Sequence, residues 1–507
     1  MLPPEPRMPE ARKLIDDGQY FIVHGPRQTG KTTCLSALAQ NLSAEGRHVA
    51  LLFSCESGEV AEDDYGTAEL QVLDAMRSAA RGRRFPPEWM PPDPWPDAPP
   101  GRRIFEGLRG WAVKAPLPLV LFFDEIDALS GKSLRTVLRQ LRDGFRSRAQ
   151  SFPATVALCG MGNVREYKAL YGSQARMTSA GPFNIIDQAL RVHDFTHQDV
   201  AALYAQHTEE TGQEFTPEAV DCAFAYSQGH PWLVNALARE ITFRMEVKPP
   251  DPITGEHMDT ARQRLILARS IHLDSLVSRL NEPRVQRVIE PLLAGTLPDD
   301  EGLTFDDDVS YVSDLGLIAA GNPVRVANPI YREVIVRILG RRTEAVVTDD
   351  PRRFVVPDGR LDFRMLLESF AAFWIENGDV LASRHNYREA AAQLVFMAYL
   401  HRIVDGSGYV NREYGVGTSR IDMQVRKPYG HHQEQREGIE LKAWREGRPD
   451  PLPAGLEQLD GYLGRLGLDT GTLIIFDRRP GSAPIHERTI FSEERSPSGR
   501  PITLLRA

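Results

Sequence analysis

The stretch Gly25-Pro-Arg-Gln-Thr-Gly-Lys-Thr-Thr33 constrains this chain more than any other part of its sequence. It follows an apolar run and precedes leucines at helical spacing. A glycine, four residues, a second glycine, a lysine and a threonine, set between a strand and a helix, are typical of a loop that binds nucleotide phosphates. Small residues let backbone N–H groups approach phosphate oxygens, and the helix start adds its positive end. We therefore predict that the chain binds a nucleoside triphosphate, against the alternative of a chance glycine turn.

The residues of this loop have separate expected parts in nucleotide binding. Lys31 is expected to reach the β- and γ-phosphates, and the Thr32 hydroxyl is expected to hold Mg²⁺. ATP and Mg²⁺ are accordingly the expected cofactors. The candidate cofactor-binding residues are the whole loop: Gly25, Pro26, Arg27, Gln28, Thr29, Gly30, Lys31, Thr32 and Thr33.

An acidic pair, Asp124 and Glu125, ends the apolar run Leu119–Phe123. Asp124 is expected to bind Mg²⁺ through water, and Glu125 is expected to orient and deprotonate the attacking water. An apolar run followed by two acids is a weak signal alone. Downstream of a good phosphate loop it becomes a strong one, and it predicts that the bound nucleotide is hydrolysed.

Length and composition limit the classes of protein that the chain can belong to. At 507 residues it is too long for one core, so we expect about two to four domains. The net charge of −9 gives no global basic field, although a local basic groove is compatible with it. Four scattered cysteines without a C-x-x-C pair argue against zinc and disulfide frameworks. With neither a signal-peptide pattern nor an apolar run near the roughly 20 residues that span a bilayer, we expect a cytoplasmic protein without a membrane partner.

Residues 1–190 alternate apolar runs with helical patterns, which predicts an α/β domain around a parallel sheet. A proline-rich stretch at 86–100 interrupts this pattern. We expect it to form an exposed, polyproline-like insertion, with a ligand for a proline-recognising module as the alternative. The expected strands are Tyr20–His24, His48–Phe53, Leu117–Phe123, Thr155–Gly160 and Phe183–Asp187.

The middle of the chain changes character twice. Residues 191–250 read as three helices, and the layout resembles the helical lid of AAA-like ATPases, with a turn near Gly229–Trp232 expected close to the adenine. Residues 251–350 read as helices followed by a short hairpin, which resembles a winged helix and ends in a linker. Acidic runs at 299–301 and 306–308 favour a protein contact or a spacer over DNA binding there.

Residues 351–507 carry a second candidate active site. Asp422 lies on one alternating strand pattern, and Glu440 and Lys442 share a face of the next. Two carboxylates on adjacent strands can hold one or two Mg²⁺ near a scissile phosphate. A nearby lysine can position the water and neutralise charge in the transition state. Glu-x-Lys alone is common on solvent-facing strands, but the order helix, three strands, helix, strand favours a nuclease here.

These motifs together resemble a known combination of domains. The C-terminal pattern resembles the PD-(D/E)xK nuclease superfamily, in the form fused behind an AAA-like, STAND-type ATPase of bacteria and archaea. The Asp-Glu pair resembles the additional-strand class of ATPases, which hydrolyse ATP. The similarity extends over nearly the full chain and is carried by Phe21–Thr33, Leu121–Asp127, Gly181–Ile185, Gly316–Tyr331 and Arg420–Lys442.

The resemblance implies a fold for each part of the chain. It implies a multidomain α/β protein with a P-loop ATPase sheet and helical lid, a winged-helix-like middle domain and a C-terminal restriction-endonuclease-like domain. The implied boundaries are 1–190 for the ATPase core, 191–250 for the lid, 251–350 for the winged-helix-like domain and linker, and 351–507 for the nuclease-like domain.

The resemblance also assigns roles to residues of the second site. In that superfamily the first core helix donates a glutamate to the metal site, and Glu389 stands at the matching position. A glutamine on the last core helix often lines the site, and Gln458 matches it. The proline that gives the superfamily part of its name is absent before Asp422. The expected catalytic residues are Glu125, Glu389, Asp422, Glu440, Lys442 and Gln458, and the expected metal ligands are Thr32, Asp124, Asp422 and Glu440.

Two functions follow from this interpretation. The leading hypothesis is an ATP-binding and hydrolysing protein that controls a C-terminal, Mg²⁺-dependent nuclease acting on DNA, with a role in genome defence suggested by analogy. The alternative is a signalling or binding ATPase whose nuclease-like domain recognises nucleic acid without cutting it. The expected partner is nucleic acid, DNA first, and assembly into a homo-oligomer stays open.

Overall fold

The structure is a computed structural model of the 507-residue chain. It describes residues 2–3, 5–148, 150–160, 185–268, 278–294, 307–319, 321, 324–383, 390–404, 408–413, 422–430 and 433–507. The chain divides into two compact units. The first comprises Met1–Leu265 with the short segment Ser313–Gly316, and the second comprises Ile266–Val312 with Leu317–Ala507.

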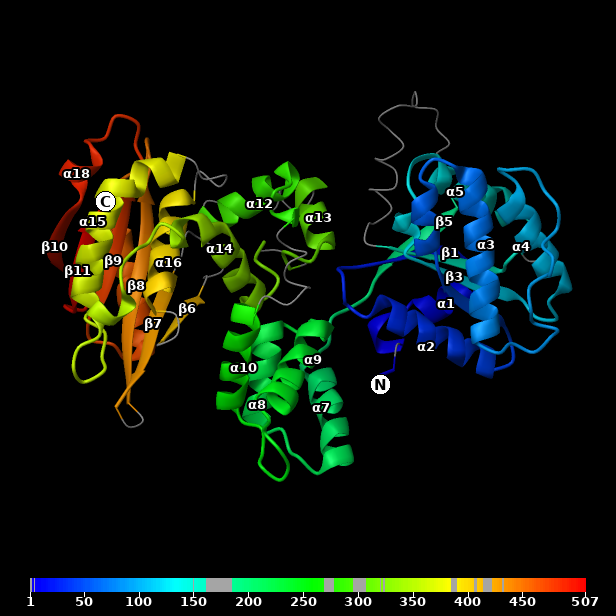
Figure 1. The fold of residues 1–507 in the computed structure, drawn as a ribbon, viewed down its shortest axis with the longest axis horizontal. Helices are drawn as coiled ribbons and strands as arrows, with labels where there is room; N and C mark the ends of the chain where they lie inside the picture. Colours follow the sequence, from blue (N-terminus) through cyan, green and yellow to red (C-terminus); the bar gives the residue numbers. More distant parts are fainter. Residues whose placement is uncertain are drawn as a thin grey trace. The chain divides into compact units, whose positions relative to one another are not determined.

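A five-stranded sheet forms the centre of the first unit (Figure 1). Its strands run in the order β2-β3-β4-β1-β5, and every described pairing is parallel. This confirms the parallel sheet that the apolar runs predicted. The strands are β1 (Tyr20–His24), β2 (Val49–Ser54), β3 (Leu119–Asp124), β4 (Thr155–Cys159) and β5 (Ile186–Arg191).

The fifth strand differs from its prediction. The expected strand was Phe183–Asp187, whereas β5 occupies Ile186–Arg191, and residues 183 and 184 lie outside the described part of the chain. Among the described strands, β5 is the last of the sheet and pairs with β1. Gln188 and Ala189 are exposed on it, so this strand lacks the continuous apolar run that marks the central ones.

Helices cover both faces of this sheet (Figure 1). Alternate residues of β1 show the division, because Phe21 and Val23 pack with α1 and α2 while Tyr20 and Ile22 pack with α3, α4 and α5. Two apolar cores therefore lie above and below one sheet. The helices are α1 (Ala11–Asp16), α2 (Lys31–Ala44), α3 (Tyr65–Gly82), α4 (Arg103–Lys114) and α5 (Gly131–Phe145), with short turns η1 (Glu5–Arg7), η2 (Glu56–Ala61) and η3 (Ile126–Ala128).

The proline-rich stretch is not the exposed insertion that its composition suggested. Trp89, Met90 and Trp95 are half-buried against the core beneath α3 and α4. The indole N–H of Trp111 donates to the carbonyl of Trp89 at 3.0 Å. Aromatic side chains bury a large apolar area, so the tryptophans hold this stretch against the domain although its prolines form no regular element.

Four helical elements and most of α10 belong to the rest of the first unit. The Thr196 hydroxyl and the Asp199 carboxylate form a reciprocal capping box at the start of α7, and Pro217 occupies the first turn of α8. Both helices lie within residues 191–250, where helices were predicted. The elements are α7 (His197–Thr211), α8 (Pro217–Ser227), α9 (Pro231–Arg239), the π-helical turn η4 (Glu240–Arg244) and α10 (Gly255–Ala268).

The second unit begins with helices and a small hairpin. Ile318 and Val326 form an antiparallel bridge between α13 and α14, at the predicted turn. Asp308, from one of the acidic runs, lies 2.7 Å from Arg284 and 2.6 Å from Arg287 of the same unit. Part of the acidic charge is therefore satisfied internally. The helices here are α12 (Pro283–Ala294), α13 (Asp307–Asp314) and α14 (Pro329–Glu344).

The chain on either side of residue 350 packs as one body. A Cβ added at Gly340 of α14 would lie 2.8 Å from the Ala398 side chain of α16, so the two helices approach closely. Between them, the buried His401 lies 2.8 Å from Glu333. Asp349, in the expected linker, accepts hydrogen bonds from Ser369 and Tyr399. Residues 341–351 thus belong to the packed unit.

A second sheet of six strands forms the rest of this unit, in the order β10-β11-β9-β8-β7-β6. Helix α17 packs on one face, and Phe370 and Trp374 of α15 contact Phe476 of β9 on the other. The helices are η6 (Pro351–Phe354), α15 (Phe363–Ser383), α16 (Ala391–Val404), α17 (Leu452–Leu466) and α18 (Ile485–Arg488). The strands are β6 (Tyr409–Glu413), β7 (Asp422–Tyr429), β8 (Gln433–Trp444), β9 (Gly471–Asp477), β10 (Ile490–Arg495) and β11 (Pro501–Arg506).

The elements from α16 to β9 follow the sequence-predicted order of helix, three strands, helix and strand. The sheet is mixed, since β7 pairs antiparallel with β8 while β8 pairs parallel with β9.

Within the part of the chain that the structure describes, no helix has the length and apolar character needed to span a membrane.

Candidate functional site

The phosphate-binding loop connects the end of β1 to the start of α2. Gly25 and Gly30 have φ angles of 150° and 83°, which glycine adopts without strain. The Thr29 hydroxyl donates to the carbonyl of Pro26 at 2.9 Å and closes the loop. Helix α2 begins at Lys31, so its first-turn N–H groups, which have no acceptor within the helix, lie at the loop.

Lys31 lies over the loop that precedes it. Its ammonium donates to the carbonyls of Gly25 at 2.7 Å and Pro26 at 2.8 Å. Burial lowers the pKa of Lys31, and the nearby Cys159, Asp127 and Asp124 oppose that shift. The ammonium is therefore held by neutral carbonyls in a desolvated position, where phosphate oxygens would be stronger acceptors.

The acidic pair lies at the same edge of the sheet as the loop. Asp124 is the last residue of β3 and is 5% exposed. Glu125 follows with a left-handed φ of 54°, and its N–H donates to Asp124 Oδ1 at 3.1 Å. Because the carboxyl ends of parallel strands meet at one edge, the pair after β3 and the phosphate loop after β1 lie at the same edge of the sheet, with β4 between the two strands.

Two residues at this edge were not predicted from the sequence. The Ser54 hydroxyl, at the end of β2, donates to the carboxylate of Glu125. Cys159 ends β4, and burial together with the nearby Asp124 raises the pKa of its thiol. The predicted second strand stopped one residue short of Ser54, and the predicted fourth strand included Cys159 without assigning it a role.

A parallel sheet with a glycine-rich loop after one strand and an acidic pair after another defines a P-loop nucleotide-binding domain. Residues 15–167 match a family of proteins described as the AAA domain. This part of the chain is therefore an AAA-type P-loop ATPase domain, which supports binding of ATP, and the family usually binds Mg²⁺ with it.

Two solved structures illustrate what this chain is similar to. The chain is similar to a Walker-type ATPase of Pyrococcus abyssi at 14% identity, over 66% of this chain and 96% of that one, with a TM-score of 0.45. It is also similar to the RuvB Holliday junction branch migration motor of Thermotoga maritima at 16% identity, over 64% and 90%, with a TM-score of 0.35. A comparison with curated protein sequences found no match.

Three of the residues predicted for the second site come together in the second unit. Glu440 is fully buried and Lys442 is 7% exposed, on the same face of β8. Lys442 Nζ lies 2.6 Å from Glu440 Oε1 and also donates to the side-chain oxygen of Gln458. Gln458 comes from α17, so the sheet and the helix above it converge on one lysine.

Helix α17 reaches this position because Gly455 has no side chain. A Cβ added at Gly455 would lie 2.9 Å from Leu473 and 3.5 Å from the Lys442 side chain. The close approach brings the next turn of the helix, with Gln458, over Lys442. The pairing of Lys442 with Gln458 is therefore built into the packing of α17 on β8 and β9.

The other two predicted residues of this site are only partly placed. In backbone register Asp422 of β7 stands opposite Glu440 of β8, while its side chain lies outside the described part of the structure. Glu389 lies outside the described residues altogether. Among the described side chains, no group of three or more histidine, cysteine, aspartate or glutamate residues is arranged to hold a metal ion.

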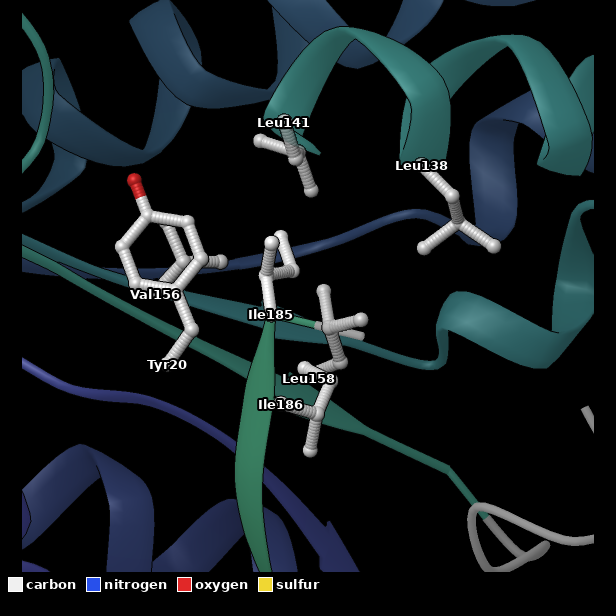
Figure 2. Close-up of a pocket in the computed structure, with 7 residues that line it drawn as sticks. All are labelled: Tyr20, Leu138, Leu141, Val156, Leu158, Ile185 and Ile186. Carbon is white, nitrogen blue, oxygen red and sulfur yellow. The ribbon is translucent and has the colours of Figure 1, made fainter. Parts of the chain in front are cut away.

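A pocket in the first unit belongs to the apolar core and not to either site. Figure 2 shows the side chains of Leu138 and Leu141 extending from α5 toward Ile185 at the edge of the sheet. Tyr20 is the one lining residue with a polar group, and its hydroxyl donates to the carbonyl of Pro153 at 3.0 Å. The lining offers nothing that would bind phosphate.

Proposed function

We propose that this protein binds and hydrolyses ATP and thereby controls a C-terminal, Mg²⁺-dependent nuclease that acts on DNA. The observation that carries the proposal is the buried contact between Lys442 and both Glu440 and Gln458. The AAA-type domain supports the ATPase half of the proposal. The boundaries 1–190, 191–250, 251–350 and 351–507 remain part of the proposal, as does a role in genome defence, which rests on analogy alone.

Burial is the main argument for a catalytic role of Glu440 and Lys442. Taking a carboxylate and an ammonium out of water costs several kcal/mol per ion, and apolar residues of similar size often serve stability as well or better. A fully buried glutamate beside a nearly buried lysine is therefore weakly explained by stability. Functional sites are where proteins commonly bury charged side chains in pairs of this kind.

The chemistry of the donor set fits Mg²⁺. Carboxylate oxygens are the ligands that Mg²⁺ prefers, and Glu440 with Asp422, opposite it in register, would hold the ion on adjacent strands. Bound Mg²⁺ would supply charge to the scissile phosphate. Lys442 would position the attacking water and neutralise charge that develops on phosphate oxygens, and Gln458 would orient the Lys442 ammonium.

In the ATPase domain the residues of the loop and of the acidic pair would have separate roles in binding phosphate, binding Mg²⁺ and activating water. Lys31 would exchange the carbonyls of Gly25 and Pro26 for nucleotide phosphates. Thr32 and Asp124 would hold the Mg²⁺ that accompanies ATP. Glu125 would orient and deprotonate the attacking water, and Ser54 fixes its carboxylate.

The test is cleavage of plasmid DNA, single-stranded DNA and RNA in Mg²⁺ by the full chain. Glu440→Gln and Lys442→Met should each abolish cutting. Glu437→Gln is the matched control, because Glu437 is a half-buried glutamate of the same strand three residues away, on the opposite face of the sheet. Its activity should stay within about twofold of wild type, since it lies on the face of the sheet opposite Glu440 and Lys442.

The outcomes of this test separate the two candidate functions. Cutting that survives Glu440→Gln or Lys442→Met would contradict the site. Wild-type protein that binds DNA but cuts no substrate under any nucleotide condition would contradict the nuclease and favour a binding ATPase. Loss of cutting in all three variants alike would point to a general loss of structure, which a thermal melt of each variant identifies.

A further inference from the structure

Arg7 is a buried arginine next to the phosphate loop that the ATPase motifs do not include. It ends the short turn η1 and is 6% exposed. Its guanidinium donates from Nε to the carbonyl of His193 at 2.8 Å and from one terminal nitrogen to the carbonyl of Thr29. The other terminal nitrogen lies 3.3 Å from the sulfur of Cys34. Each of the three nitrogens of the planar group thus contacts a fixed point of the fold.

The contact with Thr29 bears directly on the shape of the phosphate loop. Backbone N–H groups can face phosphate oxygens only where the carbonyls of the same loop point away. Arg7 gives the Thr29 carbonyl a cationic donor outside the phosphate site. Gly30 follows, and a Cβ there would lie 3.0 Å from the Arg7 guanidinium, so the loop and the arginine are in contact along two residues.

The contacts on the other side of Arg7 lead to the helices α7 to α9. The N–H of His193 donates back to the Arg7 carbonyl at 3.2 Å, and the Phe195 ring lies 4.8 Å from the guanidinium carbon. The N–H of Phe195 donates to the Gly229 carbonyl at 2.8 Å. A Cβ at Gly229 would lie only 1.9 Å from the Phe195 carbonyl oxygen. The turn before α9 therefore packs closely against the segment that contains His193 and Phe195.

We propose that Arg7 is a positioning residue for nucleotide binding: it holds the phosphate loop in its binding shape through Thr29 and ties that loop to the turn before α9 through His193 and Phe195. The inference rests on the ATP-binding part of the proposed function and is independent of the nuclease. An arginine suits the role because its planar fork makes several hydrogen bonds in fixed directions, which a lysine ammonium cannot reproduce.

The test compares Arg7→Lys with Arg148→Lys in the full chain. Arg148 is the matched control: its guanidinium donates to the carbonyls of Gly18 at 2.7 Å and Phe145 at 3.3 Å, and its carbon lies 4.1 Å from the Phe145 ring. Gly18 precedes β1, whereas the phosphate loop follows it. Each variant therefore loses the same kind of contacts, but only Arg7→Lys loses them at the loop.

Three quantities are measured: the Kd of a fluorescent ATP analogue, and the KM and kcat of ATP hydrolysis. Arg7→Lys should raise Kd and KM by about tenfold, the loss of one charged hydrogen bond, while kcat stays within about threefold. Arg148→Lys should leave all three within about twofold, at a similar loss of melting temperature. A purely structural role for Arg7 would lower the melting temperature without this separation of KM from kcat.

Two results would overturn the inference: an Arg7→Lys variant that binds the analogue within twofold of wild type, or equal weakening by both variants. If Arg7→Lys does not melt cooperatively, Phe195→Leu is titrated instead. It removes only the ring beside the guanidinium and should raise Kd about threefold, and an unchanged Kd contradicts the inference. Wild-type protein that fails to bind the analogue would instead contradict the proposed function itself.

Discussion

The Ser54 hydroxyl donates a hydrogen bond to the carboxylate of Glu125, across the ends of the neighbouring strands β2 and β3. Ser54 and Asp124 are partners in register, so the serine stands directly beside the acidic pair. The general base proposed for ATP hydrolysis is therefore oriented by a strand other than its own. This arrangement separates two properties that variants can test: the presence of the carboxylate and its orientation.

Glu125→Gln should reduce kcat for ATP hydrolysis by about 10²- to 10⁴-fold with little change in ATP affinity, because the base is lost but the phosphate contacts remain. Ser54→Ala should reduce kcat by about tenfold, because the carboxylate stays but loses its orienting bond. Steady-state hydrolysis with a parallel binding titration gives both numbers. Ser43→Ala serves as the control, because it removes a hydroxyl of α2 that hydrogen-bonds to Ala50, which lies on β2 as Ser54 does. A Ser54→Ala variant with wild-type kcat would show that this bond does not orient the base.

Lys31→Ala should weaken ATP binding by about 100-fold, because the ammonium that would contact the β- and γ-phosphates is removed. Calorimetric titration with ATP and Mg²⁺ measures the change. Lys13→Ala, at an exposed lysine of α1, should bind ATP as wild type does. Tight ATP binding by Lys31→Ala would show that the triphosphate binds at a site other than this loop.

Most of the first unit could be predicted because its sequence signals are local. The buried parallel strands are continuous apolar runs, and the phosphate loop has a fixed spacing between its glycines and lysine. The proline-rich stretch was misjudged because composition does not show where Trp89 and Trp95 are buried. Arg7 and Ser54 carry no motif, since their roles arise only when distant segments meet.

In the second unit, alternation placed Glu440 and Lys442 on one face of a strand, and the structure gives both the burial and the contact between them. The fully buried position of Glu440 could not be predicted, because a Glu-x-Lys pattern is equally common on exposed strands. The packing of α14 on α16 could not be predicted either, since it depends on Gly340 meeting Ala398 across many intervening residues. Asp422 and Glu389 stay predictions.

Two helical glycines give a matched test of that packing. Gly340→Ala should destabilise the second unit by about 1–3 kcal/mol, because the added methyl would meet the Ala398 side chain. Gly461→Ala on α17 should stabilise it by about 0.5–1 kcal/mol, since among the described residues the added Cβ would meet no atom within 4 Å beyond the adjacent backbone of its own helix, and alanine favours the helix. Urea unfolding of both variants measures the difference. Equal effects of the two substitutions would mean that α14 and α16 do not meet at Gly340.

Asp460 gives the second unit a predictable dependence on acid. Hydrogen bonds from Ser496 and Ser498, together with Arg500, lower the pKa of Asp460 to about 2. A folded-state pKa below the ordinary value of 3.8 means that the carboxylate stabilises the fold above about pH 4 and loses this effect as the pH falls toward 2. The difference in urea midpoint between wild type and Asp460→Asn should therefore shrink over that range. A constant difference would contradict the contacts that tie α17 to the β10–β11 turn.

The most direct test of the whole account is the initial rate of DNA cleavage with and without ATP, at constant free Mg²⁺. Wild type, Lys31→Ala and Lys442→Met are compared. We predict that ATP changes the wild-type rate, that Lys31→Ala cuts at a rate that ATP does not alter, and that Lys442→Met never cuts. Removal of Mg²⁺ with a chelator should stop cutting in every case. A wild-type rate that is indifferent to ATP, or a wild-type protein that cuts nothing, would contradict the claim that one end of this chain controls chemistry at the other.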